Sequence, residues 1–184
     1  MKKGGLNMDA RYVKKEKLIM DTFKSMLAVI PFEEITVQEL TKRAKIDRKT
    51  FYLHYPSMND LLLAVQIEIS SEYIERIKGL DPINDLYETV RHFFEFSEEK
   101  GRYYEIITSS TEYSYSYIRN QMIKRVVANA YPVLNPANKE QEWKIAFINN
   151  NLLFFYRDWI NKGKQETVNE IIELTYRMIK NGLN

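Results

Sequence analysis

The sequence contains no cysteine among its 184 residues and only two histidines, His54 and His92. The absence of cysteine excludes disulfides, thiolate metal sites and cysteine nucleophiles, and two histidines are too few for a histidine-rich metal centre. The longest apolar runs, residues 61–65 and 152–156, are far shorter than the roughly 18 residues that a membrane span needs. Because polar and charged residues follow the basic N-terminus, export is not expected either. We therefore expect a cytoplasmic protein that needs no metal, no other cofactor and no membrane.

Glycine and proline are scarce as well, with six and five residues. No stretch keeps the alternation of apolar and polar residues that is typical of a strand. The sequence therefore predicts an all-α protein of about nine helices, separated by short turns. We expect these helices at residues 9–30, 37–44, 48–55, 58–78, 82–99, 102–108, 111–131, 139–161 and 167–181.

The net charge of +2 is small, but it is unevenly distributed. Residues 1–56 hold twelve Lys and Arg against seven Asp and Glu, whereas residues 57–184 hold fifteen against eighteen. A positive end on an otherwise acidic chain is typical of a protein that contacts nucleic acid with that end alone.

Residues 36–55 have the anatomy of a helix-turn-helix unit. Thr36, with Glu39 three residues later, predicts a capping box for the first short helix, and Asp47 is a natural N-cap for the second. Phe51 and Tyr55 lie four residues apart, so both can face inward and hold the second helix to its support. The remaining positions of that helix are polar or amphipathic, as expected of a helix that enters the major groove of DNA.

The chemistry of the side chains assigns roles in DNA contact. Arg48 and Lys49 can donate to guanine edges or to phosphates, and Thr50 can touch a thymine methyl group or a phosphate. The candidate DNA-binding residues are Thr36, Lys45, Arg48, Lys49, Thr50, Tyr52 and His54. A helix-turn-helix is also a common packing unit, and a modest basic excess is often only a solvated face, so both interpretations stay open on these residues alone.

Residues 35–55 have the sequence Ile-Thr-Val-Gln-Glu-Leu-Thr-Lys-Arg-Ala-Lys-Ile-Asp-Arg-Lys-Thr-Phe-Tyr-Leu-His-Tyr. This segment closely resembles the N-terminal signature of the TetR family of bacterial transcription regulators. Thr36, Ala44, the segment 50–55 and the Leu61-Leu62 pair each have a counterpart in that signature. Three positions depart from it: Lys45 stands at the usual turn glycine, Thr41 at a position that is commonly small, and Met58 at a frequent lysine. The last change removes one expected phosphate contact.

The resemblance implies a division into a helix-turn-helix domain at residues 1–56 and a helical domain at residues 57–184 that binds an effector and dimerises. It further implies a transcription regulator, typically a repressor, that binds a palindromic operator as a homodimer and is released by a small molecule. The alternative is a protein of the same fold that acts mainly through a protein partner, for instance as a coactivator. An enzyme is not expected, because neither histidine has an evident carboxylate or nucleophile partner by motif, and no glycine-rich phosphate loop or metal spacing appears.

Two further sets of residues are assigned within the helical domain. The tyrosine-rich stretch and its neighbours predict an aromatic effector pocket with a few polar anchors, although aromatic residues at helical spacing are more often plain core. The candidate effector residues are His92, Phe93, Tyr103, Tyr104, Tyr113, Tyr117 and Asn150. The helix predicted at 139–161 has two apolar faces, of which one can face the core and the other a second subunit, unless both are buried in one subunit. The candidate dimer residues are Ile148, Leu152, Phe155, Trp159, Val168, Ile171, Ile172, Thr175 and Ile179.

Overall fold

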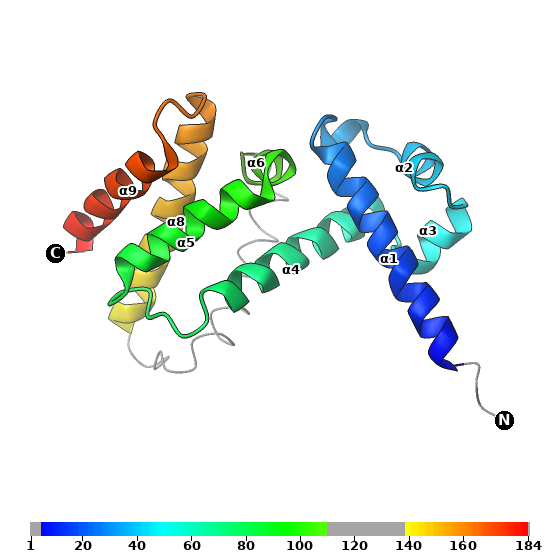
Figure 1. The fold of residues 1–184 in the computed structure, drawn as a ribbon, viewed down its shortest axis with the longest axis horizontal. Helices are drawn as coiled ribbons and strands as arrows, with labels where there is room; N and C mark the ends of the chain where they lie inside the picture. The colour runs from blue at the N-terminus through cyan, green and yellow to red at the C-terminus, as the bar shows by residue number, and fades with distance from the viewer. Residues whose placement is uncertain (1–4, 110–138, 184) are drawn as a thin grey trace. The chain divides into compact units, whose positions relative to one another are not determined.

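A computed structural model describes residues 5–109 and 139–183 of the chain. Within these ranges the regular structure consists of eight α-helices and one short 3₁₀ helix, with no strand (Figure 1). The predicted all-α class is thereby confirmed, whereas the helix predicted at residues 111–131 lies outside the described residues. The chain divides into two compact units, Met1–Ile67 and Glu68–Asn184, and the boundary falls inside helix α4, Met58–Arg76.

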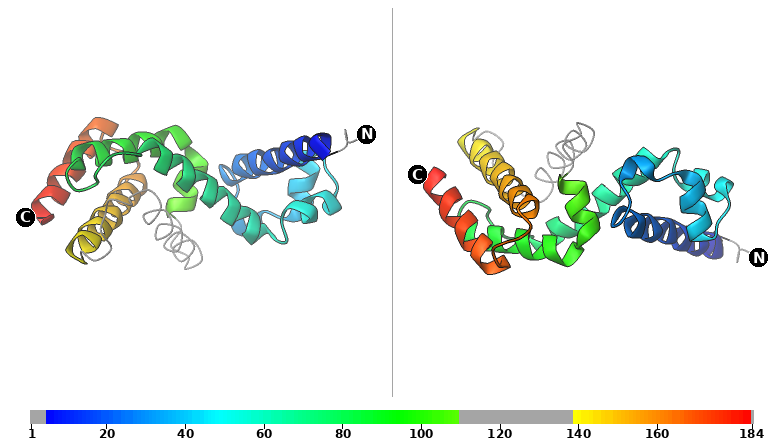
Figure 2. Two further views of the ribbon diagram at one scale, coloured as in Figure 1. Left: turned by 90° about the horizontal axis from the view of Figure 1, so that it is seen from below. Right: turned by 90° about the horizontal axis from the view of Figure 1, so that it is seen from above.

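The first unit contains α1 (Gly5–Leu27), the 3₁₀ helix Phe32–Glu34, α2 (Val37–Ala44), α3 (Arg48–His54) and the beginning of α4. Helix α1 lies along one side of this unit, and the short helices α2 and α3 lie on the other (Figures 1 and 2). Ile19 and Phe23 from α1, Leu40 from α2, Phe51 from α3 and Leu61 from α4 are completely buried. Their apolar side chains form one core that fixes the two short helices against α1.

Side chains cap the helices of this unit largely as the sequence predicts. Thr36 Oγ1 accepts from the Glu39 backbone N–H at 3.1 Å, and Asp47 Oδ1 accepts from that of Thr50 at 2.7 Å. The reciprocal half of the predicted capping box is replaced by another contact, because the Glu39 carboxylate accepts from Arg43 Nε at 3.1 Å. An arginine four residues along the same helix lies on the same face and competes directly for that carboxylate.

Lys45 forms the turn between α2 and α3 in the left-handed conformation, with φ 52° and ψ 47°. This region favours glycine, because a Cβ atom crowds the following carbonyl there. The backbone N–H of Ile46 nevertheless donates to Thr41 O at 3.0 Å, which closes the end of α2. The lysine therefore keeps the geometry that a glycine would give, at a cost in backbone strain.

The second unit contains the rest of α4 together with α5 (Leu86–Lys100), α6 (Arg102–Ser109), α8 (Lys139–Asn161) and α9 (Val168–Leu183). Helix α9 packs against both α5 and α8, and α6 packs against α8. At the centre, the ring of Tyr156 is buried among aromatic rings whose centroids lie within 6.2 Å of its own. These neighbours are Phe93, Phe94, Tyr104 and Trp159. The unit is thus organised around an aromatic core rather than an aliphatic one.

Helix α5 begins later than the sequence predicts, at Leu86 instead of residue 82. The Asp81 carboxylate accepts from the backbone N–H groups of Ile83 and Asn84, as an N-cap would. The next residues form a closed turn instead of a helix, because Asp85 donates its own N–H back to Asp81 O while its side chain accepts from the Asp81 N–H. The side chain of Asp81 thus caps a separate turn and not the helix α5 that follows it.

Two ionic clusters join the elements of the second unit. Lys164, in the loop between α8 and α9, contacts the carboxylates of Glu98 and Glu105 at 2.6 and 2.5 Å. At the end of α4, Arg76 donates to His92 Nδ1 at 3.3 Å and pairs with Glu99 at 2.5 Å. The first cluster connects α5, α6 and the α8–α9 loop, and the second connects the end of α4 to α5.

Candidate functional site

The second helix of the helix-turn-helix unit, α3, is held by one face and presents the other to solvent. Phe51 and Tyr55 are buried, as the sequence predicts, and their rings lie 6.1 Å apart. On the opposite side Tyr52 is 55% exposed and Lys49 is exposed. A helix anchored in this way can enter a groove without disturbing the core that supports it.

Arg48, at the start of α3, is held by a neighbouring helix. Its Nη2 donates to Oε1 of Gln38, an exposed residue of α2, at 2.8 Å. The bond spans the turn and orients the guanidinium at the amino end of α3, where recognition helices contact bases. Because a guanidinium carries five donors, Arg48 can keep this bond and still contact DNA.

Thr50 is engaged by the cap of its own helix. Its hydroxyl donates to Asp47 Oδ2 at 3.1 Å, in addition to the bond from its backbone N–H to the same carboxylate. These hydrogen bonds from Thr50 lower the pKa of the Asp47 carboxyl, so that the cap is charged at neutral pH. Thr50 therefore has a structural role: its hydroxyl hydrogen is committed to Asp47, and only its methyl group and the acceptor lone pairs of its hydroxyl are left for DNA.

His54 ends α3 and packs against α1. Its ring lies 4.0 Å from that of Tyr12, and its Nδ1 atom is buried without a hydrogen-bond partner. Burial lowers the pKa of the imidazole, although the nearby Glu16 carboxylate acts in the opposite direction. The neutral ring is favoured, so any phosphate contact by His54 is a single hydrogen bond from Nε2.

Leu53 is a candidate site residue that the sequence analysis missed. It is 70% exposed and follows Lys49 by four residues, so both lie on the outward face of α3. An apolar side chain at that position suits contact with a thymine methyl group. The signal was present in the sequence, because Phe51 and Tyr55 already fix the inward face and leave Leu53 on the opposite one.

The other two predicted DNA-binding residues lie at the edges of this surface. Lys45 is exposed in the turn, and Thr36 is exposed at the amino end of α2 with its hydroxyl accepting from the backbone. All seven predicted residues are thus in the first unit, on α2, the turn and α3. The helices bring Arg48, Lys49 and Tyr52 together on one exposed surface, and they leave Thr50 and His54 half-buried beside it.

The predicted effector residues are not brought together. The Nδ1 atom of His92 accepts a hydrogen bond from Arg76. Phe93 and Tyr104 belong to the aromatic core, whereas Asn150 is exposed. Tyr103 is half-buried, and Tyr113 and Tyr117 lie outside the described residues. The aromatic residues Phe93 and Tyr104 pack against Tyr156 in the core of the unit, and they do not line a cavity.

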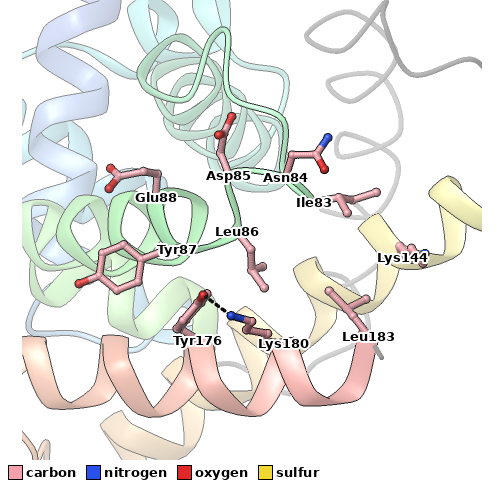
Figure 3. Close-up of a pocket in the computed structure, with 10 residues that line it drawn as sticks. All are labelled: Ile83, Asn84, Asp85, Leu86, Tyr87, Glu88, Lys144, Tyr176, Lys180 and Leu183. Atoms are coloured by element: carbon pink, nitrogen blue, oxygen red, sulfur yellow. Dashed lines mark hydrogen bonds between the residues drawn. The ribbon is translucent and has the colours of Figure 1, made fainter.

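A cavity of about 420 Å³ lies elsewhere in the second unit (Figure 3). It is formed by the turn before α5, the first turn of α5 and facing residues of α8 and α9. Leu86 from α5 and Leu183 from α9 contribute apolar side chains to its lining, while Lys180 donates to the hydroxyl of Tyr176 at 3.1 Å. Its lining residues are Ile83, Asn84, Asp85, Leu86, Tyr87, Glu88, Lys144, Tyr176, Lys180 and Leu183. None of the predicted effector residues is among them.

The predicted dimer residues lie mainly inside the subunit. Seven of the nine are buried within the second unit, and only Phe155 and Val168 are partly exposed. The buried ones are Ile148, Leu152, Trp159, Ile171, Ile172, Thr175 and Ile179. The physical reason is the packing of α5 and α9 around α8, which buries this apolar face of α8 in its own subunit.

The other apolar face of α8 is exposed. Trp143 is 76% and Phe154 61% exposed, and Phe147 is also open to solvent. Phe147 lies directly over Gly182 of α9, where an added Cβ would come within 2.7 Å of its ring. Leu174 and Met178 extend the exposed apolar residues onto α9. Large apolar side chains on two adjoining helices are typical of a protein interface.

Residues 5–109 and 139–183 contain no group of three or more His, Cys, Asp or Glu placed to hold a metal ion. Nor is any helix within these ranges both long and apolar enough to cross a membrane.

The sequence of the first unit matches a family of known regulators. Residues 19–65 match the family model described as bacterial regulatory proteins, tetR family. A curated relative, the uncharacterized HTH-type transcriptional regulator YuxN of Bacillus subtilis (strain 168), is 39% identical over 51 residues. That match spans 28% of this chain and 18% of the relative. The family-model match therefore lies within the helix-turn-helix unit.

The fold as a whole resembles solved regulators at low sequence identity. The fatty acid degradation regulator FadR from Bacillus halodurans has a TM-score of 0.69 at 14% identity, with 90% of this chain and 94% of that chain covered. FadR from Bacillus subtilis, solved in complex with stearoyl-CoA, has a TM-score of 0.69 at 13% identity, with 89% and 96% covered. NalD, the secondary repressor of the MexAB-OprM multidrug efflux pump in Pseudomonas aeruginosa, has a TM-score of 0.68 at 13% identity, with 95% and 97% covered.

Proposed function

We propose that this chain, whose residues 19–65 match the model of the tetR family of bacterial regulatory proteins, is a transcription regulator that binds operator DNA as a homodimer and is released by a small molecule. Residues 1–56 form its DNA-binding domain, and residues 57–184 bind the effector and dimerise. Repression is the outcome that the proposal assigns to DNA binding.

The observation that supports DNA binding best is the outward face of α3. Lys49, Tyr52 and Leu53 are exposed there side by side, while Arg48 is oriented at the start of the helix by Gln38. A donor, an amphipathic ring and an apolar side chain on one short helix match the groups that a major groove presents. Lys45 and the amino end of α2 supply candidate phosphate contacts next to this face.

The experiment is fluorescence anisotropy with the chain and a labelled duplex from upstream of its own gene, over a range of salt concentrations. Arg48→Ala and Leu53→Ala should each weaken binding by about 1–3 kcal/mol if they contact bases. Lys42→Ala, on the exposed part of α2, is the matched control. Unchanged binding in both α3 variants would reject this face as the reading surface.

The homodimer follows from the geometry that an operator imposes. Two recognition helices must lie about 34 Å apart to enter successive major grooves, which one copy of this chain cannot supply. We place the interface on the exposed apolar face of α8 and α9, which replaces the buried face that the sequence suggested. Two copies of these helices would then form a four-helix bundle.

The effector is placed in the second unit, in the cavity of Figure 3. The structure of Bacillus subtilis FadR in complex with stearoyl-CoA makes this compound the first ligand to test. Apolar side chains next to the ammonium group of Lys180 in the lining suit an amphipathic anion. Because binding linkage is reciprocal, a ligand that weakens operator binding must itself bind more weakly to the DNA complex by the same factor.

Isothermal titration of stearoyl-CoA with and without operator DNA tests that coupling. Lys180→Glu should weaken the ligand, whereas the control Lys162→Glu changes an exposed lysine that lines no part of the cavity. Equal loss in both variants would place the ligand elsewhere.

The competing function is an interaction protein that keeps the fold and acts through a protein partner. Two departures from the family signature, Lys45 and Met58, favour it. An absence of DNA binding even at low salt would support this alternative, because phosphate contacts are strongest there.

A further inference from the structure

The positive charge of the DNA-binding end lies mostly outside the segment that matches the family. Residues 1–18 hold six Lys and Arg against two Asp and Glu, whereas residues 19–56 hold six against five. The family match begins at residue 19. The helix-turn-helix unit itself is therefore nearly neutral, and the excess of cations belongs to the segment that precedes it.

Part of that segment is ordered as a continuation of α1. Helix α1 begins at Gly5, more than three turns before the family match. Arg11, Lys14 and Lys15 are exposed on it, and no carboxylate among the described residues pairs with any of the three. Lys17 differs, because its Nζ lies 3.3 Å from Asp21.

The structure also shows where these cations lie relative to the reading helix. Tyr12 stacks on His54, the last residue of α3, with ring centroids 4.0 Å apart. Arg11 adjoins Tyr12, and Lys15 lies one turn further on the same face as Arg11. Both therefore project from α1 within one turn of the point where it meets the end of α3.

A helix seated in the major groove has a row of phosphates on either side of it. Exposed cations beside the end of that helix meet one of these rows, and each neutralised phosphate releases a counterion. We propose that Arg11 and Lys15 of α1 form a phosphate-binding extension of the DNA-binding surface of α3. Tyr12 is the positioning residue that fixes this part of α1 to α3. This inference rests on the proposed function.

The extension carries no sequence information, so its loss affects all DNA alike. Arg11→Gln combined with Lys15→Gln removes both charges while keeping unbranched, polar side chains of similar helix propensity at two exposed positions. In a dimer this variant removes four phosphate contacts. The slope of log Kd against log salt should therefore become shallower by about 3–4, with the same change on the upstream duplex and on an unrelated duplex.

Two controls separate this inference from the proposed function. Lys17→Gln removes the same charge from the same helix but at a residue paired with Asp21, so its slope should stay near that of the wild type. Tyr12→Phe should bind as the wild type does, whereas Tyr12→Ala should lose part of the slope although it removes no charge.

The outcomes are distinct. If Leu53→Ala weakens operator binding while the Arg11, Lys15 variant keeps the wild-type slope, the extension is rejected and the reading helix stands. A loss confined to the upstream duplex would also reject it, because phosphate contacts are blind to sequence. A wild-type chain that binds neither duplex at low salt would overturn both proposals.

Discussion

The ring of Tyr12 in α1 lies 4.0 Å from the imidazole of His54 at the end of α3. This contact joins two segments that are about forty residues apart in sequence, and it lies at the edge of the core rather than within it, since Tyr12 is 41% exposed. Stacked aromatic rings in such a position stabilise a contact that apolar burial alone leaves weak. The end of the reading helix therefore depends on α1 for its order.

Replacing Tyr12 with alanine should loosen the end of α3. The expected loss is about 1 kcal/mol, the usual contribution of one aromatic pair. Both tryptophans of the chain, Trp143 and Trp159, are in the second unit, so intrinsic fluorescence does not report on this region. Hydrogen exchange of the α3 amides is the appropriate measurement, with Tyr12→Phe as control; equal protection in all three proteins would contradict the prediction.

The first unit should lose stability in mildly acidic solution through His54. Burial lowers its pKa in the folded chain, with Glu16 acting in the opposite direction, whereas the unfolded chain keeps a value near 6.5. Between these two values the unfolded state binds more protons, so the free energy of unfolding falls as the pH drops from about 7 through 6.5 and stops falling below the folded pKa.

The pH dependence can be assigned with one substitution. His54→Asn removes the titrating ring, so α3 amide protection between about pH 7 and 5 should become insensitive to pH. The Asp47 carboxyl, whose pKa the hydrogen bonds from Thr50 lower, stays ionised throughout this window and does not contribute. Unaltered pH dependence in the variant would assign the effect to another group.

Local signals were sufficient to predict the helix-turn-helix unit. The N-caps at Thr36 and Asp47 and the inward pair Phe51 and Tyr55 depend on residues close in sequence, and the structure confirms all four. The choice between the two apolar faces of α8 could not be made in this way. Ile148 and Phe147 are adjacent and both apolar, and only the positions of α5 and α9, which periodicity does not give, decide which one is buried.

Lys45→Gly tests the strain in the turn. A residue other than glycine in the left-handed region costs about 1–3 kcal/mol, part of which glycine loses again through greater freedom in the unfolded chain. The free energy of unfolding of the first unit should therefore rise by about 1 kcal/mol. If Lys45 also contacts a phosphate, the same variant should bind DNA more weakly and with a shallower salt slope, so that stability and affinity change in opposite directions.

Glu105→Gln should destabilise the second unit. Glu105 is buried and contacts both Lys164 and Arg102. Burial tends to raise the pKa of this carboxyl, but the hydrogen bonds from these two cations outweigh it and the pKa is lowered. A neutral amide leaves part of the cluster uncompensated, for an expected loss of about 1–3 kcal/mol.

Urea unfolding followed by tryptophan fluorescence measures this loss, because Lys164 lies 5.1 Å from the Trp159 ring. The matched control is Asp158→Asn, which breaks the exposed pair with Lys162 and should change stability by less than about 0.5 kcal/mol. Similar losses in the two variants would mean that burial of the cluster has no energetic consequence.

Phe147→Glu should dissociate the proposed dimer without unfolding the subunit. The residue lies between α8 and α9 on the exposed apolar face, over Gly182, so a carboxylate there would be buried against its counterpart if two copies met on this face. Light scattering during size-exclusion chromatography should give a dimer for the wild type and a monomer for the variant at the same concentration. Val13→Glu, an exposed apolar residue of α1, is the control and should stay dimeric. A Phe147→Glu variant that remains dimeric would move the interface to another surface.

Ile148, the next residue of α8, is fully buried within its own subunit. Ile148→Ala therefore leaves a cavity in the core and should lower the free energy of unfolding by about 2–5 kcal/mol.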